Sequence, residues 1–567
     1  IAKTGSQRTA ALSPSPMISP TLSTLLLFAL GARGTPSVKL GKTTVVGTTL
    51  PTYGQELFAG IPYAEPPVGQ LRFAPPVLTT SLNGSSFNAT QFGPACLQPT
   101  GTTTPHSLPA DGLISEDCLT VNVIRPTGVN STSNLPVMFW TYGGGFFNGA
   151  SIVYNGSAIV AQSVERGTPV IYVNFNYRLG PLGWPQGQEA MDIGVVNLGL
   201  KDQLAALEWV QKNIAKFGGD KRKVLVFGES AGSMMTSMQF LNSRLDKYAR
   251  AAILQSGSQA SPGLFDAARR DNIWSLFVGA VPSCASLAGS NSTFSCLRQN
   301  ATSAELLSGF LATMSQANDR FPWDPVIDGP GGLIPELPSL MLAKGEFSKL
   351  PFIAGTNMDE GTVFANAQLN STAEINATMI AGRSPSISPA ELQTSILRIL
   401  ELYPDNPSLE SPYGTGNDTF GLSSQYKRYA AIDGDMDFHS QRRLWINTAA
   451  NASVPTYGYL FTQPQPQQAA RLGVSHGSDI DYILGKPTDQ SASSLLISRL
   501  MIDYWVSFAT SLTPNDGLGI QRAEWKQFTP TAKSLLQLNG DNVTMIPDTY
   551  REEQIAFINS NPQIWRH

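Results

Sequence analysis

The segment Lys223–Ser233 reads KVLVFGESAGS and places a serine between two apolar runs. Val224–Phe227 predicts a buried strand, and the residues from Ala231 onward predict a helix. The turn between them matches G-x-S-x-G, in which a serine on a sharp strand-to-helix turn projects its hydroxyl off the end of a sheet. We therefore expect Ser230 to be a nucleophile, with the backbone N–H of Ala231 directed at the reacting site.

Short apolar runs recur along the chain, and several end at a glycine. An apolar repeat over 197–217 predicts a helix just before the serine strand. Continuous apolar strands that alternate with helices are typical of an α/β fold with a large, mostly parallel central sheet flanked by helices, whose active site lies at the carboxyl ends of the strands. Further strands are predicted within 115–125, 135–142, 169–177, 250–258, 350–357 and 457–461, and a hairpin within 38–55.

The composition is that of a folded protein with little net charge. The chain has 567 residues, of which 42% are hydrophobic and 14% charged, and its net charge is −4. So low a charged fraction argues against disorder, and the near balance of charges gives no indication of nucleic-acid binding.

The N-terminal residues predict a secretory signal peptide. The apolar run Thr21–Leu30 is followed by Gly-Ala-Arg-Gly at 31–34. An apolar run of about 10–12 residues before a small-x-small site is typical of a signal peptide and too short to span a membrane. We therefore expect residues 1–34 to be removed, residues 35–567 to form a single catalytic domain, and the protein to be secreted without a membrane anchor.

Cysteines and glycosylation sequons agree with secretion. The chain has four cysteines, which allow three pairings, and we favour Cys96–Cys118 and Cys284–Cys296 because each closes a short loop. A zinc site is the alternative, but the chain lacks a C-x-x-C pattern. N-x-S/T sequons are frequent and predict surface glycans. They begin at Asn83, Asn88, Asn130, Asn155, Asn291, Asn300, Asn370, Asn376, Asn417, Asn451 and Asn542.

Four histidines are candidates for the base that would activate Ser230. In this kind of fold the order along the chain is serine, acid, histidine. His106 precedes the serine, and His567 is the last residue. His439 lies in a stretch that looks helical, which favours a packing role, whereas His476 lies in a glycine-flanked loop after a late strand. We therefore predict His476 as the base.

The acid that orients the histidine has two candidates, Asp359 and Glu360, which follow the strand predicted at 350–357. Their spacing does not choose between them. The run Gly143–Gly145 after another strand fits neither G-x-G-x-x-G nor a phosphate-binding P-loop. Its N–H groups would instead join that of Ala231 in an oxyanion hole. Ser475 also lies in a G-x-S-x-G pattern, but no clear strand precedes it.

Taken together, these segments resemble the type-B carboxylesterase/lipase family of the α/β-hydrolase fold, which includes cholinesterases and fungal lipases; the chain looks most similar to secreted fungal members. The matching segments are Phe58–Gly69, Ser115–Leu119, Tyr142–Phe146, Asn176–Arg178, Gly228–Gly232, Asp359–Gly361 and His476–Gly477.

The resemblance implies the roles of several residues. The acid would be Glu360, the oxyanion donors would be Gly144, Gly145 and Ala231, and the cysteines would pair as favoured above. Two ion pairs would hold the fold without taking part in catalysis: Arg72 with Glu116, and Arg178 with Asp202.

The implied function is a secreted serine carboxylic-ester hydrolase that uses a Ser-His-Glu triad and needs no cofactor or metal. Its partner would be a small-molecule or lipid ester. The loop between Cys96 and Cys118 is polar and lacks tryptophan, unlike the tryptophan-bearing loop of cholinesterases or the longer lid of the family's lipases. A lipase or sterol esterase is the alternative, and a non-catalytic adhesion protein is a further one.

Overall fold

A mixed sheet of eleven strands carries the fold of the computed structural model, which describes residues 34–101, 106–241, 243–384 and 386–567. The strand order is β18-β17-β16-β15-β12-β11-β9-β10-β8-β4-β3. All neighbours from β17 through β10 are parallel, whereas the pairs at the two ends are antiparallel. The predicted α/β fold with a large, mostly parallel sheet is therefore confirmed. The predicted signal peptide lies outside the described residues, except for Gly34.

The strands of this sheet are β3 (Thr48–Leu50), β4 (Gln55–Pro62), β8 (Thr120–Pro126), β9 (Leu135–Thr141), β10 (Ile171–Phe175), β11 (Gly219–Glu229), β12 (Ala251–Gln255), β15 (Phe352–Asn357), β16 (Thr456–Phe461), β17 (Ser534–Leu538) and β18 (Thr544–Pro547). Three small sheets consist of β1 (Ser37–Leu40), β2 (Thr43–Val46) and β5 (Ser86–Asn88); β6 (Ala95–Cys96) and β7 (Ile114–Ser115); and β13 (Phe265–Asp266) and β14 (Val326–Ile327).

The α-helices are α1 (Ser157–Glu165), α2 (Gly180–Gly183), α3 (Gln188–Asp192), α4 (Leu198–Asn213), α5 (Ala231–Met238), α6 (Asp271–Gly279), α7 (Thr293–Gln299), α8 (Ser303–Gln316), α9 (Pro338–Lys344), α10 (Thr372–Ala381), α11 (Pro389–Leu402), α12 (Ser424–Gly434), α13 (Ser440–Asn451), α14 (Ile480–Ile483), α15 (Ala492–Ser511), α16 (Glu552–Ser560) and α17 (Pro562–Trp565). Two short helical turns also matter for the site: η8 (Glu360–Val363) and the π-helical turn η10 (Asp435–His439). Within the described ranges, no helix combines the length and apolar character needed to cross a bilayer.

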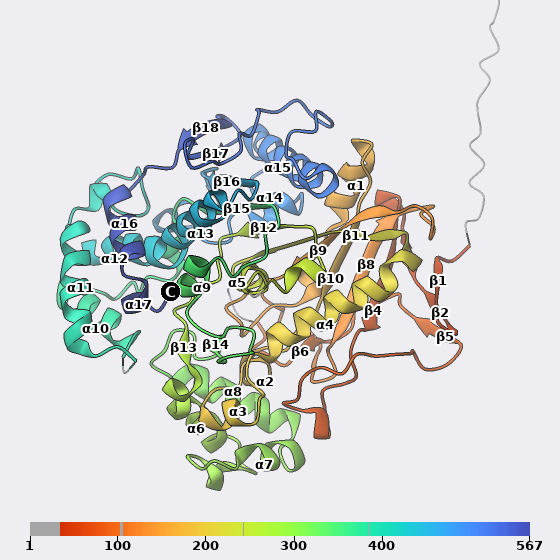
Figure 1. Ribbon diagram of the computed structural model, residues 1–567, viewed down its shortest axis with the longest axis horizontal. Helices are drawn as coiled ribbons and strands as arrows, with labels where there is room; N and C mark the ends of the chain where they lie inside the picture. Colours follow the sequence, from red (N-terminus) through yellow and green to blue (C-terminus); the bar gives the residue numbers. More distant parts are fainter. Residues whose placement is uncertain (1–33, 102–105, 242, 385) are drawn as a thin grey trace, which may run out of the picture. The chain divides into compact units, whose positions relative to one another are not determined.

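Helices cover the sheet, as Figure 1 shows, with α1, α14 and α15 gathered on one side and α4 and α5 on the other. The central strands β9, β10 and β12 consist almost wholly of buried residues. Such strands need a cover on both faces, because their apolar side chains alternate between the two. The predicted long helix is α4, which ends in a 3₁₀ turn at Ile214–Phe217 and then at Gly218, whose φ is +91°.

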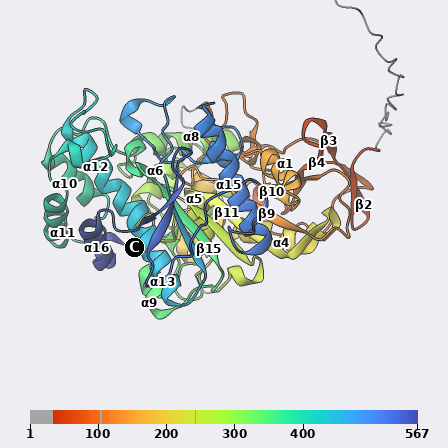
Figure 2. The same cartoon turned by 90° about the horizontal axis from the view of Figure 1, so that it is seen from above.

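A second apolar core lies among α10, α11, α12 and α16, which Figures 1 and 2 both show together at the end of the unit away from β2. Ser388 and Glu391 form a capping box at the start of α11, and Pro389 occupies its first turn. Ile396 and Ile399 are buried on the inner face of this helix. Helix α12 of this core leads directly into η10, which contributes side chains next to the candidate site.

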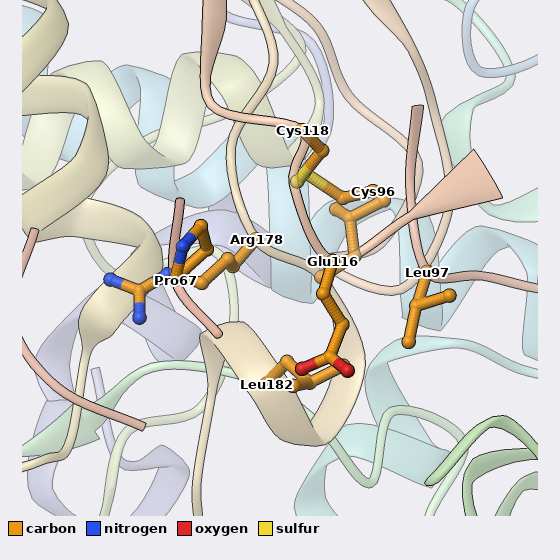
Figure 3. A pocket seen from close by; sticks show the side chains of 8 residues that line it. Pro67, Cys96, Leu97, Glu116, Cys118, Arg178 and Leu182 are labelled. Atoms are coloured by element: carbon orange, nitrogen blue, oxygen red, sulfur yellow. A yellow bond between two sulfur atoms is a disulfide. The ribbon is translucent and has the colours of Figure 1, made fainter. Parts of the chain in front are cut away.

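Both favoured disulfides are formed, Cys96–Cys118 and Cys284–Cys296. Figure 3 shows the first of them in the wall of a pocket that Glu116 and Arg178 also line. Each of these charged residues belongs to one of the predicted ion pairs. Arg72 Nε donates to Glu116 at 2.7 Å, and the Arg178 guanidinium donates to Asp202 at 2.7 and 2.9 Å.

Candidate active site

Ser230 lies on the predicted turn between β11 and α5, with φ 53° and ψ −128°. A positive φ is costly for a residue with a side chain, so the surrounding structure must impose it. Its N–H donates to the Gln255 carbonyl at 2.9 Å, and its own carbonyl accepts from Met234 at 2.8 Å. A Cβ on Gly232 would lie 2.0 Å from the Thr141 carbonyl oxygen. The glycine is therefore required for α5 to start this close to β9.

The glycine run lies directly beside the serine. A Cβ on Gly143 would lie 2.8 Å from Cβ of Ser230. Gly144 and Gly145 both have positive φ, +101° and +60°, and a Cβ on Gly144 would lie 2.2 Å from the Asn148 carbonyl oxygen. The loop thus needs glycine both for its backbone conformation and for space, and it brings the two candidate oxyanion donors to the carboxyl end of β9.

The structure brings Glu360, and not Asp359, to His476. Glu360 Oε2 lies 2.5 Å from His476 Nδ1. Its other oxygen, Oε1, accepts from Ser256 Oγ and from the N–H of Asn357, both at 2.6 Å. The carboxylate is therefore fixed on both sides, and it leaves Nε2 of the imidazole as the nitrogen that can face a substrate. Spacing alone left this choice open, and the resemblance implied Glu360; of the two adjacent side chains at the start of η8, that of Glu360 contacts the imidazole.

Glu229 is a site residue that the sequence reasoning did not name. Its Oε1 lies 3.3 Å from His476 Nε2, and its side chain is 4% exposed. Burial raises the pKa of Glu229 to about 8. Burial would by itself lower the pKa of His476, but the nearby carboxylates of Glu229 and Glu360 outweigh it and raise that pKa to about 9. In the sequence, the feature that could have indicated Glu229 is its position directly before Ser230.

Aromatic rings surround the histidine and reach the glycine loop. Phe364 and Phe438 have ring centroids 5.0 and 4.7 Å from that of His476. Phe321 packs on Phe364 at 6.0 Å and on Phe147 at 6.4 Å. We call Phe147, Phe321, Phe364 and Phe438 the aromatic wall; these rings form an apolar boundary next to the candidate catalytic groups.

Arg320 lies across the aromatic wall. Its guanidinium is 4.9 Å from the ring centroids of both Phe321 and Phe364. It also donates to Asp433 at 2.9 Å and to Asp437 at 3.0 Å. One side chain thereby ties the wall to α12 and to the turn η10.

The remaining histidines and Ser475 have other environments. His439 is buried, with Nδ1 3.1 Å from Thr356 Oγ1, and burial lowers its pKa well below the usual value. His567 is buried against Gln441, and His106 stacks on Tyr154. Ser475 Oγ donates to Gln468.

The described residues contain no group of three or more His, Cys, Asp or Glu side chains arranged to hold a metal ion.

Comparisons with known proteins each match nearly the whole chain. The model of the carboxylesterase family matches residues 34–558. Lipase 2 of Diutina rugosa is 34% identical over 95% of this chain and 99% of its own, and Secreted lipase 1 of Botryotinia fuckeliana is 34% identical over 94% and 93%. The crystal structure of Aspergillus niger EstA superposes with a TM-score of 0.79 at 25% identity and covers 94% of this chain and 99% of its own. The chain therefore belongs to the carboxylesterase family.

Proposed function

We propose that this carboxylic-ester hydrolase is a secreted serine esterase that works through Ser230, His476 and Glu360. Membership of the carboxylesterase family gives the reaction class. The observation that carries the finer proposal is the 2.5 Å contact between Glu360 and His476 Nδ1, formed at the same end of the sheet as the strained serine turn.

The mechanism follows from these positions. Glu360 holds the proton on Nδ1, so Nε2 of His476 takes the proton of Ser230 as the hydroxyl attacks the ester carbonyl. The N–H groups of Gly144, Gly145 and Ala231 stabilise the oxyanion; loss of one such donor typically costs about 2.7–4 kcal/mol. The alcohol leaves with the proton from His476, and water then releases the acid from the acyl-enzyme by the same steps in reverse.

Replacement of the nucleophile tests this mechanism. Ser230→Ala should lower kcat on p-nitrophenyl butyrate by at least roughly a thousandfold, because the acyl-enzyme can no longer form. Ser315→Ala, on the outer face of α8, is the control and should keep wild-type activity. Wild-type rates in Ser230→Ala would exclude the proposed nucleophile.

A lipase is the alternative that the comparisons favour, because two of the fungal relatives above are named lipases. The loop between the first two cysteines speaks against a large lid, since only 22 positions separate Cys96 from Cys118. Rates on soluble short-chain esters and on emulsified long-chain triglycerides separate the two. A jump in rate above the solubility limit would favour the lipase.

An adhesion protein of the same fold would lack a reactive serine. A fluorophosphonate probe should label Ser230 of the folded protein. Absence of the adduct would favour adhesion.

Secretion rests on the apolar N-terminal segment, on two disulfides, and on relatives such as the secreted lipase of Botryotinia fuckeliana. The sequon asparagines are exposed, except Asn376, which is half-buried and donates to Gln393. Enzymatic deglycosylation of protein collected from culture medium should lower its apparent mass. Protein retained inside the cells would contradict secretion.

A further inference from the structure

Asp359, the acid that does not reach the imidazole, is bound to the loop that carries the imidazole. We call residues 473–477 the histidine loop. Asp359 Oδ2 accepts from the N–H of Val474 at 2.9 Å, and the N–H of Asp359 donates back to the Val474 carbonyl at 3.0 Å. The two segments thus form a short bridge that ends two residues before His476.

Gly473 makes this contact possible. Its backbone has φ 58° and ψ −135°, and a Cβ there would lie 2.4 Å from Asp359 Oδ2. The chain therefore turns onto the carboxylate at the one residue type that allows both this conformation and this approach.

The carboxylate is itself held from a third segment. Oδ1 of Asp359 accepts from Ser411 Oγ at 3.0 Å and from the N–H of Tyr413 at 2.9 Å. The side chain is 1% exposed, so each of these donors would lose its partner if the carboxylate were removed. These three donors to the carboxylate thus belong to the loops around Ser411 and Val474.

We infer that Asp359 is a positioning residue for His476: it fixes the backbone of the histidine loop while its neighbour Glu360 fixes the imidazole ring. This inference rests on the proposed function. Because the two acids are consecutive, one peptide unit sets the distance between the anchor of the loop and the anchor of the ring. A looser loop would let Nδ1 leave Glu360 and would misplace Nε2 relative to the serine hydroxyl, and displacements of about 1 Å can cost a hundredfold in rate.

The decisive variant is Asp359→Asn. Each carboxylate oxygen accepts a hydrogen bond from one backbone N–H, so an amide of the same size must place its NH₂ group against one of these donors. With p-nitrophenyl butyrate, kcat should fall by about 10–100-fold while KM stays within about twofold. The pH at which kcat/KM is half-maximal should also fall, since contact with Glu360 supports the protonated imidazole. The other carboxylates that act on the imidazole, Glu229 and Asp479, remain in place.

Asp503→Asn is the matched control. Asp503 is also 1% exposed, accepts from the N–H of Ile520 at 2.7 Å, and lies against Gly519, whose φ is +82° and whose Cβ would meet Oδ2 at 2.2 Å. Like Asp359 it is a buried carboxylate beside a glycine turn, but it lies away from the histidine loop and also pairs with Arg166 and Arg522. This variant should lower the thermal midpoint but keep kcat within about twofold and leave the pH midpoint unchanged.

The outcomes separate this inference from the proposed function. If the wild type hydrolyses the ester and Ser230→Ala does not, but Asp359→Asn loses no more kcat than Asp503→Asn or keeps its pH midpoint, the positioning role is wrong. If Ser230→Ala retains wild-type activity, the proposed function fails first.

Ser411→Ala covers the case in which Asp359→Asn does not fold. This change deletes only one donor to Oδ1 and should lower kcat by about threefold to tenfold with KM unchanged. A kcat equal to that of the wild type would overturn the inference.

Discussion

His476 is flanked by two carboxylates, one on each ring nitrogen. Glu360 lies 2.5 Å from Nδ1, and Glu229 lies 3.3 Å from Nε2. In the proposed mechanism Nε2 must be unprotonated to accept the serine proton, so Glu229, when it ionises above its raised pKa, opposes the active state of the base. The sequence indicated the serine and the histidine, because chain order and turn patterns are local; spacing left two acids open, and the resemblance chose Glu360. The sequence did not indicate Glu229, because the contact between the end of β11 and the histidine loop forms only in the folded chain.

Glu229→Gln should shift the pH profile. Removal of the negative charge destabilises the imidazolium, so the pKa of His476 falls and kcat/KM reaches half its maximum at a lower pH than the wild type. The measurement is kcat/KM from pH 5 to 10. Glu208→Gln, at an exposed ion pair with Lys212, serves as control and should leave the profile unchanged. An unmoved midpoint in Glu229→Gln would show that its charge does not act on the base.

At the scale of elements, four segments distant in sequence build the aromatic wall: the glycine loop after β9, the segment before β14, the end of η8, and the turn η10. The central strands and α4 were predictable because long apolar runs decide them locally. Strand β4 was not predictable in this way. Prolines near its end obscure the pattern, and its position depends on pairing with β8. The stretch around His439 was expected to be helical, and it is a π-helical turn between α12 and α13. A π-helical turn is wider than an α-helical one, and Phe438 in this turn contacts the imidazole of His476.

Phe321→Ala should enlarge the space beside the catalytic groups. The ring is half-buried and packs on Phe147 and Phe364, so its removal opens the wall without exposing the main core. The ratio of kcat/KM for bulky esters to that for butyrate should rise by about tenfold, the scale of discrimination by small apolar volumes. Leu409→Ala, at a side chain that is 61% exposed, is the control. A ratio that does not change would mean that the wall does not contact the substrate.

At the scale of the whole molecule, buried ion pairs join segments that are far apart in the chain. Arg178 donates to Asp202 in α4 and also to the carbonyl of Ala74 at 2.7 Å. The resemblance predicted the pair itself, but the third segment follows only from the assembled structure. Because both charged groups are buried, each one offsets the cost of burying the other, and loss of either would leave an unpaired buried charge.

Arg178→Met should therefore lower the free energy of unfolding by about 3–5 kcal/mol, because Asp202 is 0% exposed and would be left as an unpaired buried charge. Denaturant unfolding measures the change. Addition of Asp202→Leu to the same chain should recover part of the loss. A single variant as stable as the wild type would show that water or another donor replaces the guanidinium.

The ends of the sheet carry a consequence for association between molecules. A row of unpaired backbone groups on an outer strand is a template for a strand from another chain. Here the outer strands are short: β3 has three residues, and β18 has four and ends in Pro547, which has no N–H to offer. Both also run antiparallel to their neighbours, β4 and β17. Each margin of the sheet therefore offers few backbone groups to a further strand, which limits edge-to-edge aggregation.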